Sequence, residues 1–430
     1  MKVTVIGSTK SIKELECNSI PKEAEIFAGR NAGICYMADD YFSEKASDID
    51  DCFKRAKRTA KSGHYSVYGH YHITFLLEGI SKAVAMVLNN ITTYNTSEKS
   101  ARYTKMKPET ELEQQLYEKW QSKFEDLIKA YGEENYVKLA QENARYMISV
   151  FTPTTMSYTI PYNRLLLLFH WIDQFDFDIR DYGNKAKIDE YSYSYFKRLA
   201  AELMILKSAF INAIGFSDTE NVDLEEHKDM YLDLFYNIRP GEFNTYSSDS
   251  IDELKSHYGD VYLSTYKASF ACVAQLQRHR TTKIKIQIDK HKRDFYIPAL
   301  IKNTILEKEW SNDMTSLIKE GIHPQGLLVD VVETGRFEDF VLKCKERLCS
   351  RAQYEAMDVT RNQVKKFIFF AEKNLDYYNQ KLLKDITNIE LEHMDASYKL
   401  NPEVKPRCCF DNYTCKEPCK LGKNGLCRNF

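Results

Sequence analysis

The sequence has no long hydrophobic run and almost no net charge. Its longest apolar stretch, LLLLFHWI at residues 165–172, is far shorter than the about 20 residues that a membrane-spanning helix needs. The 60 lysines and arginines are balanced by 62 aspartates and glutamates, and a net charge of −2 argues against general binding to nucleic acid. The first residues, MKVTVIGSTK, indicate a short strand and a turn rather than a signal peptide. We therefore expect a soluble, cytoplasmic protein that binds neither membranes nor nucleic acid.

Cysteine is sparse over most of the chain. Six of the 11 cysteines are scattered through it, and in a reducing compartment we expect them to be buried thiols. The other five lie in the last 23 residues, where Cys409, Cys415, Cys419 and Cys427 have five, three and seven residues between them. Four thiolates this close together could hold Zn²⁺ or an iron–sulfur cluster, although the spacing matches no common pair of CxxC units. Disulfides are the alternative, which a reducing compartment disfavours.

The length and the apolar content allow a sizeable core. With 430 residues, 43% of them hydrophobic, the chain can form two ordinary domains or one large one. Apolar spacing predicts a strand that runs into a buried helix at residues 72–88, and helical structure over residues 108–150 with a break at Gly132. Further helices are predicted over residues 49–62, 163–173 and 195–214. Acidic, turn-rich sequence within residues 217–250 indicates a junction.

After the junction an early pattern returns. The stretch ISKAVAMVLNNITT at residues 80–93 aligns with ASFACVAQLQRHRTT at residues 268–282, with serine, alanine and leucine at matching positions and one inserted residue. The spacing of about 190 residues indicates a weak internal repeat. The polar residues differ, because Asn89 and Asn90 stand in the first copy where the second has the cationic triplet Arg278-His279-Arg280.

These residues resemble the flavin-dependent thymidylate synthases, the ThyX family. Its signature is Arg-His-Arg, seven residues and then Ser-x-Arg-Tyr. Gly-His-x-Ser/Thr lies upstream, and an Arg, four residues and then Ala-Gln-Trp-Glu follow later. The first half is similar at GHYSVYGH (63–70), TTYNTSEKSARY (92–103) and ENARYMISVF (142–151), but it lacks Arg-His-Arg. The second half has QLQRHR (275–280) and RLCSRAQYEA (347–356), where Tyr replaces Trp, but it lacks Ser-x-Arg-Tyr.

The two losses are complementary. In the family each active site is shared between subunits, and the residues of one side are kept here in the front half, as Glu98, Ser100, Arg102 and Arg145. Those of the other side are kept in the back half, as Gln275, Arg278 and Arg347. Random decay would scatter the losses, so the segregation indicates a fused pair of repeats in which each copy has specialised. Two chains would then form a homodimer that is a pseudo-tetramer, with two working sites and two degenerate ones.

The resemblance implies an α+β fold, with an antiparallel or mixed sheet and flanking helices in each of two tandem domains. We expect the first repeat over residues 1–225, the second over residues 226–398 and a Cys-rich tail over residues 399–430. It also implies reductive methylation of dUMP to dTMP, with FAD as cofactor and with methylenetetrahydrofolate and NADPH as co-substrates. The folate supplies the carbon, and the flavin, reduced by NADPH, supplies hydride.

The resemblance also gives each matching residue a role at the nucleotide. Arg102 and Arg145 are expected at the dUMP phosphate, because a guanidinium fork suits a phosphate dianion. Ser100 and Arg102 are two residues apart, so in an extended segment both would point to the same side. Arg347 is expected beside the pyrimidine, where a fixed charge makes C5 a better nucleophile, and we assign catalysis to Arg347 and Ser100. Glu98, Gln275 and Arg278 complete the expected dUMP site.

Flavin binding is expected from a second group of residues. Arg278, His279 and Arg280 would bind FAD, although a helix C-terminus alone also favours such cations. The other residues expected at FAD are His64, Ser66, Asn163 and Arg164. The histidines of GHYSVYGHYH could alternatively indicate a metal site, but no carboxylate or Cys is near them in sequence.

Three functions stay open at this level. The first is thymidylate synthesis; the second is transfer of a different one-carbon unit, such as hydroxymethyl, to a pyrimidine nucleotide. The third is a non-catalytic flavin- or nucleotide-binding relative, in which the missing motifs mean real loss. Whether a working site forms within one chain or between chains is also open.

Overall fold

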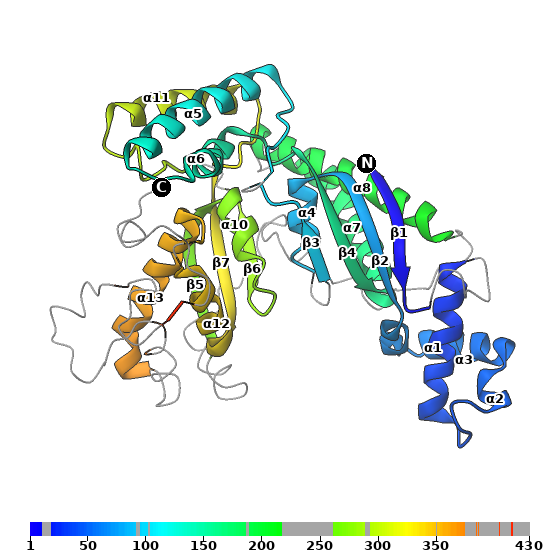
Figure 1. Ribbon diagram of the computed structural model, residues 1–430. Coiled ribbons are helices and arrows are strands. Elements are labelled where there is room, and N and C mark those ends of the chain that lie inside the picture. The colour runs from blue at the N-terminus through cyan, green and yellow to red at the C-terminus, as the bar shows by residue number, and fades with distance from the viewer. Residues whose placement is uncertain are drawn as a thin grey trace. The chain divides into compact units, whose positions relative to one another are not determined.

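The computed structural model describes most of the chain, in eight long stretches. These are residues 1–10, 19–91, 95–101, 104–185, 189–216, 261–288, 293–349 and 351–374, together with residues 384, 386, 404, 414 and 415. The chain divides into two compact units, and each is discontinuous in sequence (Figure 1). Unit 1 is Met1–Ser100 with Pro153–Asp233, and unit 2 is Ala101–Thr152 with Leu234–Phe430. Residues 101–152, from the front half of the sequence, therefore pack with the back half.

Unit 1 is built on a four-stranded antiparallel sheet. Its strands are β1 (Lys2–Ser8), β2 (His72–Ser81), β3 (Asn95–Glu98) and β4 (Pro153–Pro161), in the order β1-β2-β4-β3. Buried and less buried residues alternate along β2 and β4, as expected for strands with one face on the core. Phe75 of β2 lies opposite Tyr158 of β4 and packs its ring 4.7 Å from that of Phe210. The sheet thus buries an aromatic face against helix α8.

The helices of unit 1 lie around this sheet and at its end. They are α1 (Ile20–Tyr36), α2 (Glu44–Ser47), α3 (Ile49–Lys61), the 3-10 helix η2 (Tyr65–His70), α4 (Lys82–Leu88), α7 (Tyr162–Lys185) and α8 (Glu190–Ile214). The predicted strand and helix at residues 72–88 are confirmed as β2 followed directly by α4. None of the helices in the described part of the chain is long and apolar enough to cross a membrane.

The contact between α1 and α3 depends on a glycine. A Cβ atom at Gly29 would lie 1.9 Å from the carbonyl oxygen of Cys52, so the two helix backbones touch there. We expect Gly29→Ala to lower the free energy of unfolding by about 1–3 kcal/mol, because the helices must move apart. Gly33→Ala is the matched control, since its nearest neighbour would be Met37 Sδ at 3.4 Å. In urea denaturation, Gly33→Ala should leave the free energy of unfolding unchanged or raise it. If both variants lowered it equally, the close contact at Gly29 would not be the cause.

Unit 2 contains a three-stranded antiparallel sheet. Its strands are β5 (Val261–Ser269), β6 (Lys283–Gln287) and β7 (Leu328–Arg336), in the order β5-β7-β6. The helices next to it are α10 (Phe270–Leu276), α12 (Phe337–Arg347) and α13 (Tyr354–Asn374). In Figure 1, α10 follows directly from the end of β5, as α4 follows β2 in unit 1.

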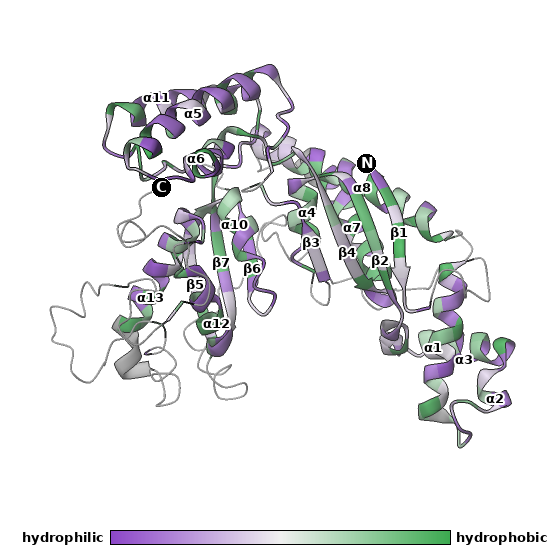
Figure 2. Cartoon of the chain, viewed as in Figure 1, coloured by the Kyte–Doolittle hydropathy of each residue, from purple (hydrophilic) through white to green (hydrophobic). Residues whose placement is uncertain are grey.

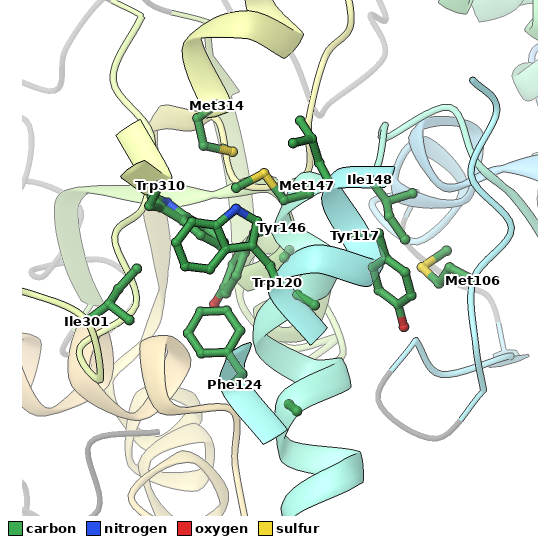
Figure 3. Close-up of a cluster of buried hydrophobic side chains, with 14 of the residues drawn as sticks. Met106, Tyr117, Trp120, Phe124, Tyr146, Met147, Ile148, Ile301, Trp310 and Met314 are labelled. Atoms are coloured by element: carbon green, nitrogen blue, oxygen red, sulfur yellow. The ribbon is translucent and has the colours of Figure 1, made fainter. Parts of the chain in front are cut away.

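A helical layer completes unit 2. It consists of α5 (Glu111–Ala130), α6 (Tyr136–Ala144), the 3-10 helix η3 (Arg145–Met147) and α11 (Ile305–Lys319). Helices α5 and α11 lie side by side, and the rings of Trp120 and Trp310 are 4.8 Å apart in their shared core (Figure 3). Hydrophilic and hydrophobic residues alternate along both helices in Figure 2, as in amphipathic helices with one face on a core. This core is the reason that residues 101–152 belong to unit 2.

The same order of elements occurs twice along the chain. Apart from α6 and η3, which lie between α5 and β4, the series β2-α4-β3-α5-β4-α7 parallels β5-α10-β6-α11-β7-α12. In each sheet the last strand of the series pairs with both of its other strands. The aligned serines also have one role, since Ser81 Oγ accepts from Val84 N at 3.1 Å and Ser269 Oγ from Cys272 N at 3.0 Å. Each serine thereby caps the helix that follows its strand. The division into two tandem repeats stays a prediction.

Candidate functional site

The cationic triplet follows the end of α10 in unit 2. Arg278 and Arg280 are exposed, whereas His279 between them is only 7% exposed. The backbone N–H groups of Arg278 and His279 donate to the carbonyls of Gln275 and Leu276 and close the last turn. The triplet thus stands at a helix C-terminus, and its two arginines point away from the core.

Gln275 and Arg347 come together beside the triplet. Arg347 Nη2, at the end of α12, donates to the carbonyl oxygen of Gln275 at 3.3 Å. The side chain of Gln275 is 8% exposed, and among the described residues its Oε1 has no hydrogen-bond partner. A buried acceptor of this kind costs free energy until a donor reaches it, so Gln275 is suited to receive an N–H group of a ligand.

Arg145 is the front-half residue that reaches this part of unit 2. It begins η3, is 5% exposed, and donates from Nη2 to Oε1 of Gln353. Gln353 in turn donates from Nε2 to the hydroxyl of Tyr146, which donates to Glu355 Oε2 at 2.8 Å. A buried arginine from residues 101–152 is therefore held by residues that come more than 200 positions later.

The chain of hydrogen bonds ends at the N-terminus of α10. The Glu355 carboxylate accepts from the backbone N–H of Ser269 at 2.8 Å and from its hydroxyl at 2.5 Å. Burial raises the pKa of Glu355, and the hydrogen bonds from Ser269 and Tyr146 oppose that shift. Sequence reasoning missed Gln353, Tyr146 and Glu355. For Gln353 and Glu355 the available signal was the Ala-Gln-Tyr-Glu segment at residues 352–355, of which only the preceding arginine had been assigned a role.

Charged groups from both halves of the sequence converge on α10. Burial raises the pKa of the Cys272 thiol well above its usual value, and the nearby Glu355 adds to the shift. Arg145 and Arg347 both act in the opposite direction on this one thiol. The middle of α10 therefore lies within electrostatic reach of an arginine from each half of the sequence.

His279 is held neutral by the same surroundings. Burial, followed by the charges of Arg347 and Lys343, lowers the pKa of His279 from 6.5 to about 3. Its Nε2 lies 3.7 Å from a carboxylate oxygen of the exposed Glu346. At neutral pH the ring is uncharged, so of the triplet only Arg278 and Arg280 present a positive charge.

This pKa shift predicts a pH dependence of stability. The unfolded chain binds the His279 proton below about pH 6.5, whereas the folded one does so only near pH 3. The stabilisation is thus complete above pH 6.5 and is lost as the pH falls towards 3. Relative to His279→Gln, the wild type should lose about 1.4 kcal/mol of unfolding free energy per pH unit in this window. Urea denaturation at pH 7, 6 and 5 measures it, and parallel profiles would contradict the shift.

Two more of the front-half nucleotide residues, Glu98 and Ser100, fall in unit 1. Glu98, at the end of β3, pairs with Lys82 Nζ and accepts from Asn89 Nδ2 at 3.3 Å. Lys82 also donates to the carbonyl of Lys99 at 2.9 Å, so the start of α4 is tied to the end of β3. Ser100 is partly buried just beyond. Arg102 lies outside the described residues.

The expected flavin residues of unit 1 lie around η2. His64 and Ser66 are exposed, and Asn163 Nδ2 donates to the carbonyl of Tyr65 between them at 3.4 Å. Among the described residues, the buried Oδ1 of Asn163 has no hydrogen-bond partner. The structure thus brings Asn163 to the turn that carries His64 and Ser66, and Arg164 follows it at the start of α7.

The predicted metal site lies for the most part outside the described residues. Cys409, Cys419 and Cys427 lie outside the described residues, and Cys415 is a partly buried free thiol. Within the described ranges no group of three or more His, Cys, Asp or Glu side chains is arranged to hold a metal ion.

Comparisons with known proteins give one family and a few solved structures. The model of the thymidylate synthase complementing protein family matches residues 20–182. Thymidylate synthase X from Helicobacter pylori, solved with FAD and dUMP, is 17% identical over 54% of this chain and 100% of its own, with a TM-score of 0.29. A second structure of the flavin-dependent enzyme from Helicobacter pylori, complexed with FAD and dUMP, is 17% identical over 53% of this chain and 96% of its own, with a TM-score of 0.30.

A third solved structure is a UMP/dUMP methylase from Streptomyces cacaoi bound with 5-Br dUMP. It is 19% identical over 39% of this chain and 76% of its own, with a TM-score of 0.25. No curated protein sequence matches the chain significantly. The family match begins at the first residue of α1, ends within α7, and contains Glu98, Ser100, Arg145 and Asn163. Residues 20–182 of this chain are therefore similar to the thymidylate synthase complementing protein family, whose model they match.

Proposed function

We propose that the protein methylates dUMP to dTMP, with FAD as cofactor, methylenetetrahydrofolate as carbon donor and NADPH as reductant. The observation that carries the proposal is the meeting of both halves of the sequence in unit 2. Arg145 there contacts Gln353, and Arg347 contacts the carbonyl of Gln275. The resemblance assigns these arginines to opposite sides of one nucleotide site.

Each residue has a chemical task in this proposal. Arg145 binds the phosphate through charge-assisted hydrogen bonds, each worth about 1.5–3 kcal/mol. The buried acceptor of Gln275 receives an N–H of the nucleotide. Arg347 places a permanent positive charge beside the pyrimidine, which stabilises negative charge on the ring as C5 attacks the one-carbon unit. The resemblance also assigns Glu98, Ser100 and Arg102 to dUMP binding.

The residues expected at FAD fit an anionic, hydrogen-bonding cofactor. Arg278 and Arg280 are exposed and charged beside a neutral His279, which suits the phosphates of a dinucleotide. In unit 1 the buried Oδ1 of Asn163 would accept a hydrogen bond near His64 and Ser66. When bound, the flavin supplies hydride, and these side chains hold and orient it.

The proposal includes the repeat and its assembly. The first repeat spans residues 1–225 and the second residues 226–398, with the Cys-rich tail at residues 399–430. Two chains form a homodimer with the symmetry of a pseudo-tetramer and one working dUMP site per chain. The contacts of Arg145 and Arg347 within unit 2 favour a site whose two arginines come from a single chain.

Product analysis tests the function directly. Purified protein is loaded with FAD and incubated with dUMP, methylenetetrahydrofolate and NADPH, and the nucleotides are separated by chromatography and mass spectrometry. We expect dTMP, with no product when the folate is omitted or when deoxyuridine replaces dUMP. A hydroxymethyl product would replace thymidylate synthesis by a related one-carbon transfer. A protein that binds neither flavin nor dUMP would contradict both enzymatic functions.

A further inference from the structure

We infer that Gln353 is a positioning residue: through its hydrogen bond to Arg145 it presents that guanidinium to the phosphate, and so sets the preference for a nucleotide over a nucleoside. The inference rests on the proposed function and deepens it. It concerns a residue to which the resemblance gave no role. The contacts that carry it lie wholly within unit 2.

A series of hydrogen bonds links Arg145 through Gln353 and Tyr146 to Glu355. The acceptor at its last position determines which group donates at every earlier one. Glu355 is the terminal acceptor, because its carboxylate receives the Tyr146 hydroxyl and two groups of Ser269. With its proton committed to Glu355, the Tyr146 oxygen can only accept, and it accepts from Gln353 Nε2. The amide oxygen of Gln353 must then point towards Arg145, whose Nη2 donates to it. One orientation of Gln353 therefore satisfies the whole chain.

Burial makes this orientation rigid. The exposed fractions are 1% for Tyr146, 1% for Gln353, 3% for Glu355 and 5% for Arg145. An arginine side chain otherwise loses rotamer entropy when a ligand immobilises it. An arginine already held by Gln353 has lost much of that freedom before the phosphate arrives, which increases affinity without any new contact.

The chain also connects the phosphate side of the site to the base side. Ser269, which donates to Glu355, caps α10 by accepting from Cys272 N at 3.0 Å. The same helix carries Gln275 six residues after Ser269. Arg145 and the buried acceptor of Gln275 are thereby tied to one framework, which sets the separation between a bound phosphate and a bound base.

The test compares two buried glutamines of the back half. Gln353→Met removes the acceptor for Arg145 and keeps the side-chain length. Gln363→Met is the matched control, because Gln363 is 2% exposed, lies on α13, and accepts at 2.9 Å from a different buried cation, Lys343. Tyr146→Phe is a second variant, which keeps the ring but removes the hydroxyl that accepts from Gln353 and donates to Glu355. Calorimetry gives the Kd of each FAD-loaded protein for dUMP and for deoxyuridine.

We expect Gln353→Met to weaken dUMP binding about tenfold or more, with the Kd for deoxyuridine unchanged. Tyr146→Phe should weaken dUMP binding less, in the same direction. Gln363→Met should leave the Kd for dUMP unchanged, even if it lowers the stability of the protein as much as Gln353→Met does. The inference is overturned if Gln353→Met weakens both ligands equally or behaves like Gln363→Met. A wild type that binds dUMP no better than deoxyuridine would instead contradict the proposed phosphate site itself.

Discussion

Replacing Arg347 by methionine should lower kcat for dTMP formation by about 10²–10³-fold, with a much smaller change in the Kd for dUMP. The reason is that the guanidinium acts mainly on charge that develops in the pyrimidine during reaction, and interactions made only in the transition state appear in kcat. Its position supports this role, since Nη2 lies 3.3 Å from the carbonyl of Gln275 at the end of α10. Steady-state kinetics with saturating dUMP and folate measure the effect.

Arg351→Met is the control for this prediction. Arg351 is an exposed arginine four residues further along, and we expect its replacement to leave kcat nearly unchanged. Arg347→Lys keeps the charge but loses the planar fork, so it should recover only part of the activity. If Arg347→Met kept full kcat and only raised KM, Arg347 would bind the nucleotide without assisting the chemistry.

Lys343→Met should lower the free energy of unfolding of unit 2 by about 3–5 kcal/mol. Lys343 of α12 and Glu333 of β7 form an ion pair in which both side chains are 0% exposed. The carboxylate also accepts from the hydroxyls of Tyr262 at 2.7 Å and Tyr266 at 2.6 Å. Burial alone would raise the pKa of Glu333, but Lys343 and these hydroxyls lower it overall, so removing the lysine leaves a buried charge without its partner. Urea denaturation followed by tryptophan fluorescence measures the loss.

The double variant Lys343→Met/Glu333→Gln separates the pair from its parts. Because the second change removes the buried negative charge, it should restore much of the stability lost in the first. Lys345→Met, at a partly exposed position on the same helix, should change stability by less than about 0.5 kcal/mol. A Lys343→Met variant as stable as Lys345→Met would contradict the burial of the pair.

Local structure was predictable where neighbouring residues determine it. The passage from strand to helix at residues 72–88 is confirmed as β2 and α4, and the break at Gly132 is confirmed by its φ of 79°. Helix α7 runs to Lys185, beyond the predicted end at residue 173, because the later residues keep helical spacing with more charges. Helix α1 was not predicted, since its buried positions include the small side chains Ala24, Ala28 and Ala32, which give a weak apolar pattern.

Long-range packing was not predictable in the same way. The meeting of α5 with α11 depends on two apolar helix faces separated by nearly 200 residues, and amphipathic spacing does not name a partner. The basic segment KCKERLCSR gives no local sign that its first lysine, Lys343, is fully buried against Glu333. The role of Gln353 depends on the fold as well, because only the packing of unit 2 brings Arg145 to it.

The central claim, that one site takes Arg145 and Arg347 from a single chain, is tested most directly by mixing two inactive variants. Arg145→Met and Arg347→Met chains are co-expressed with different tags, the mixed dimers are purified, and dTMP formation is measured at low dUMP. Dimers of wild type with either variant serve as controls and should keep about half of the activity, as one site per chain requires. We expect no activity in the mixed dimer, since every site would lack one of the arginines. Recovery of about half the wild-type rate would contradict it and place the two arginines of a site on different chains.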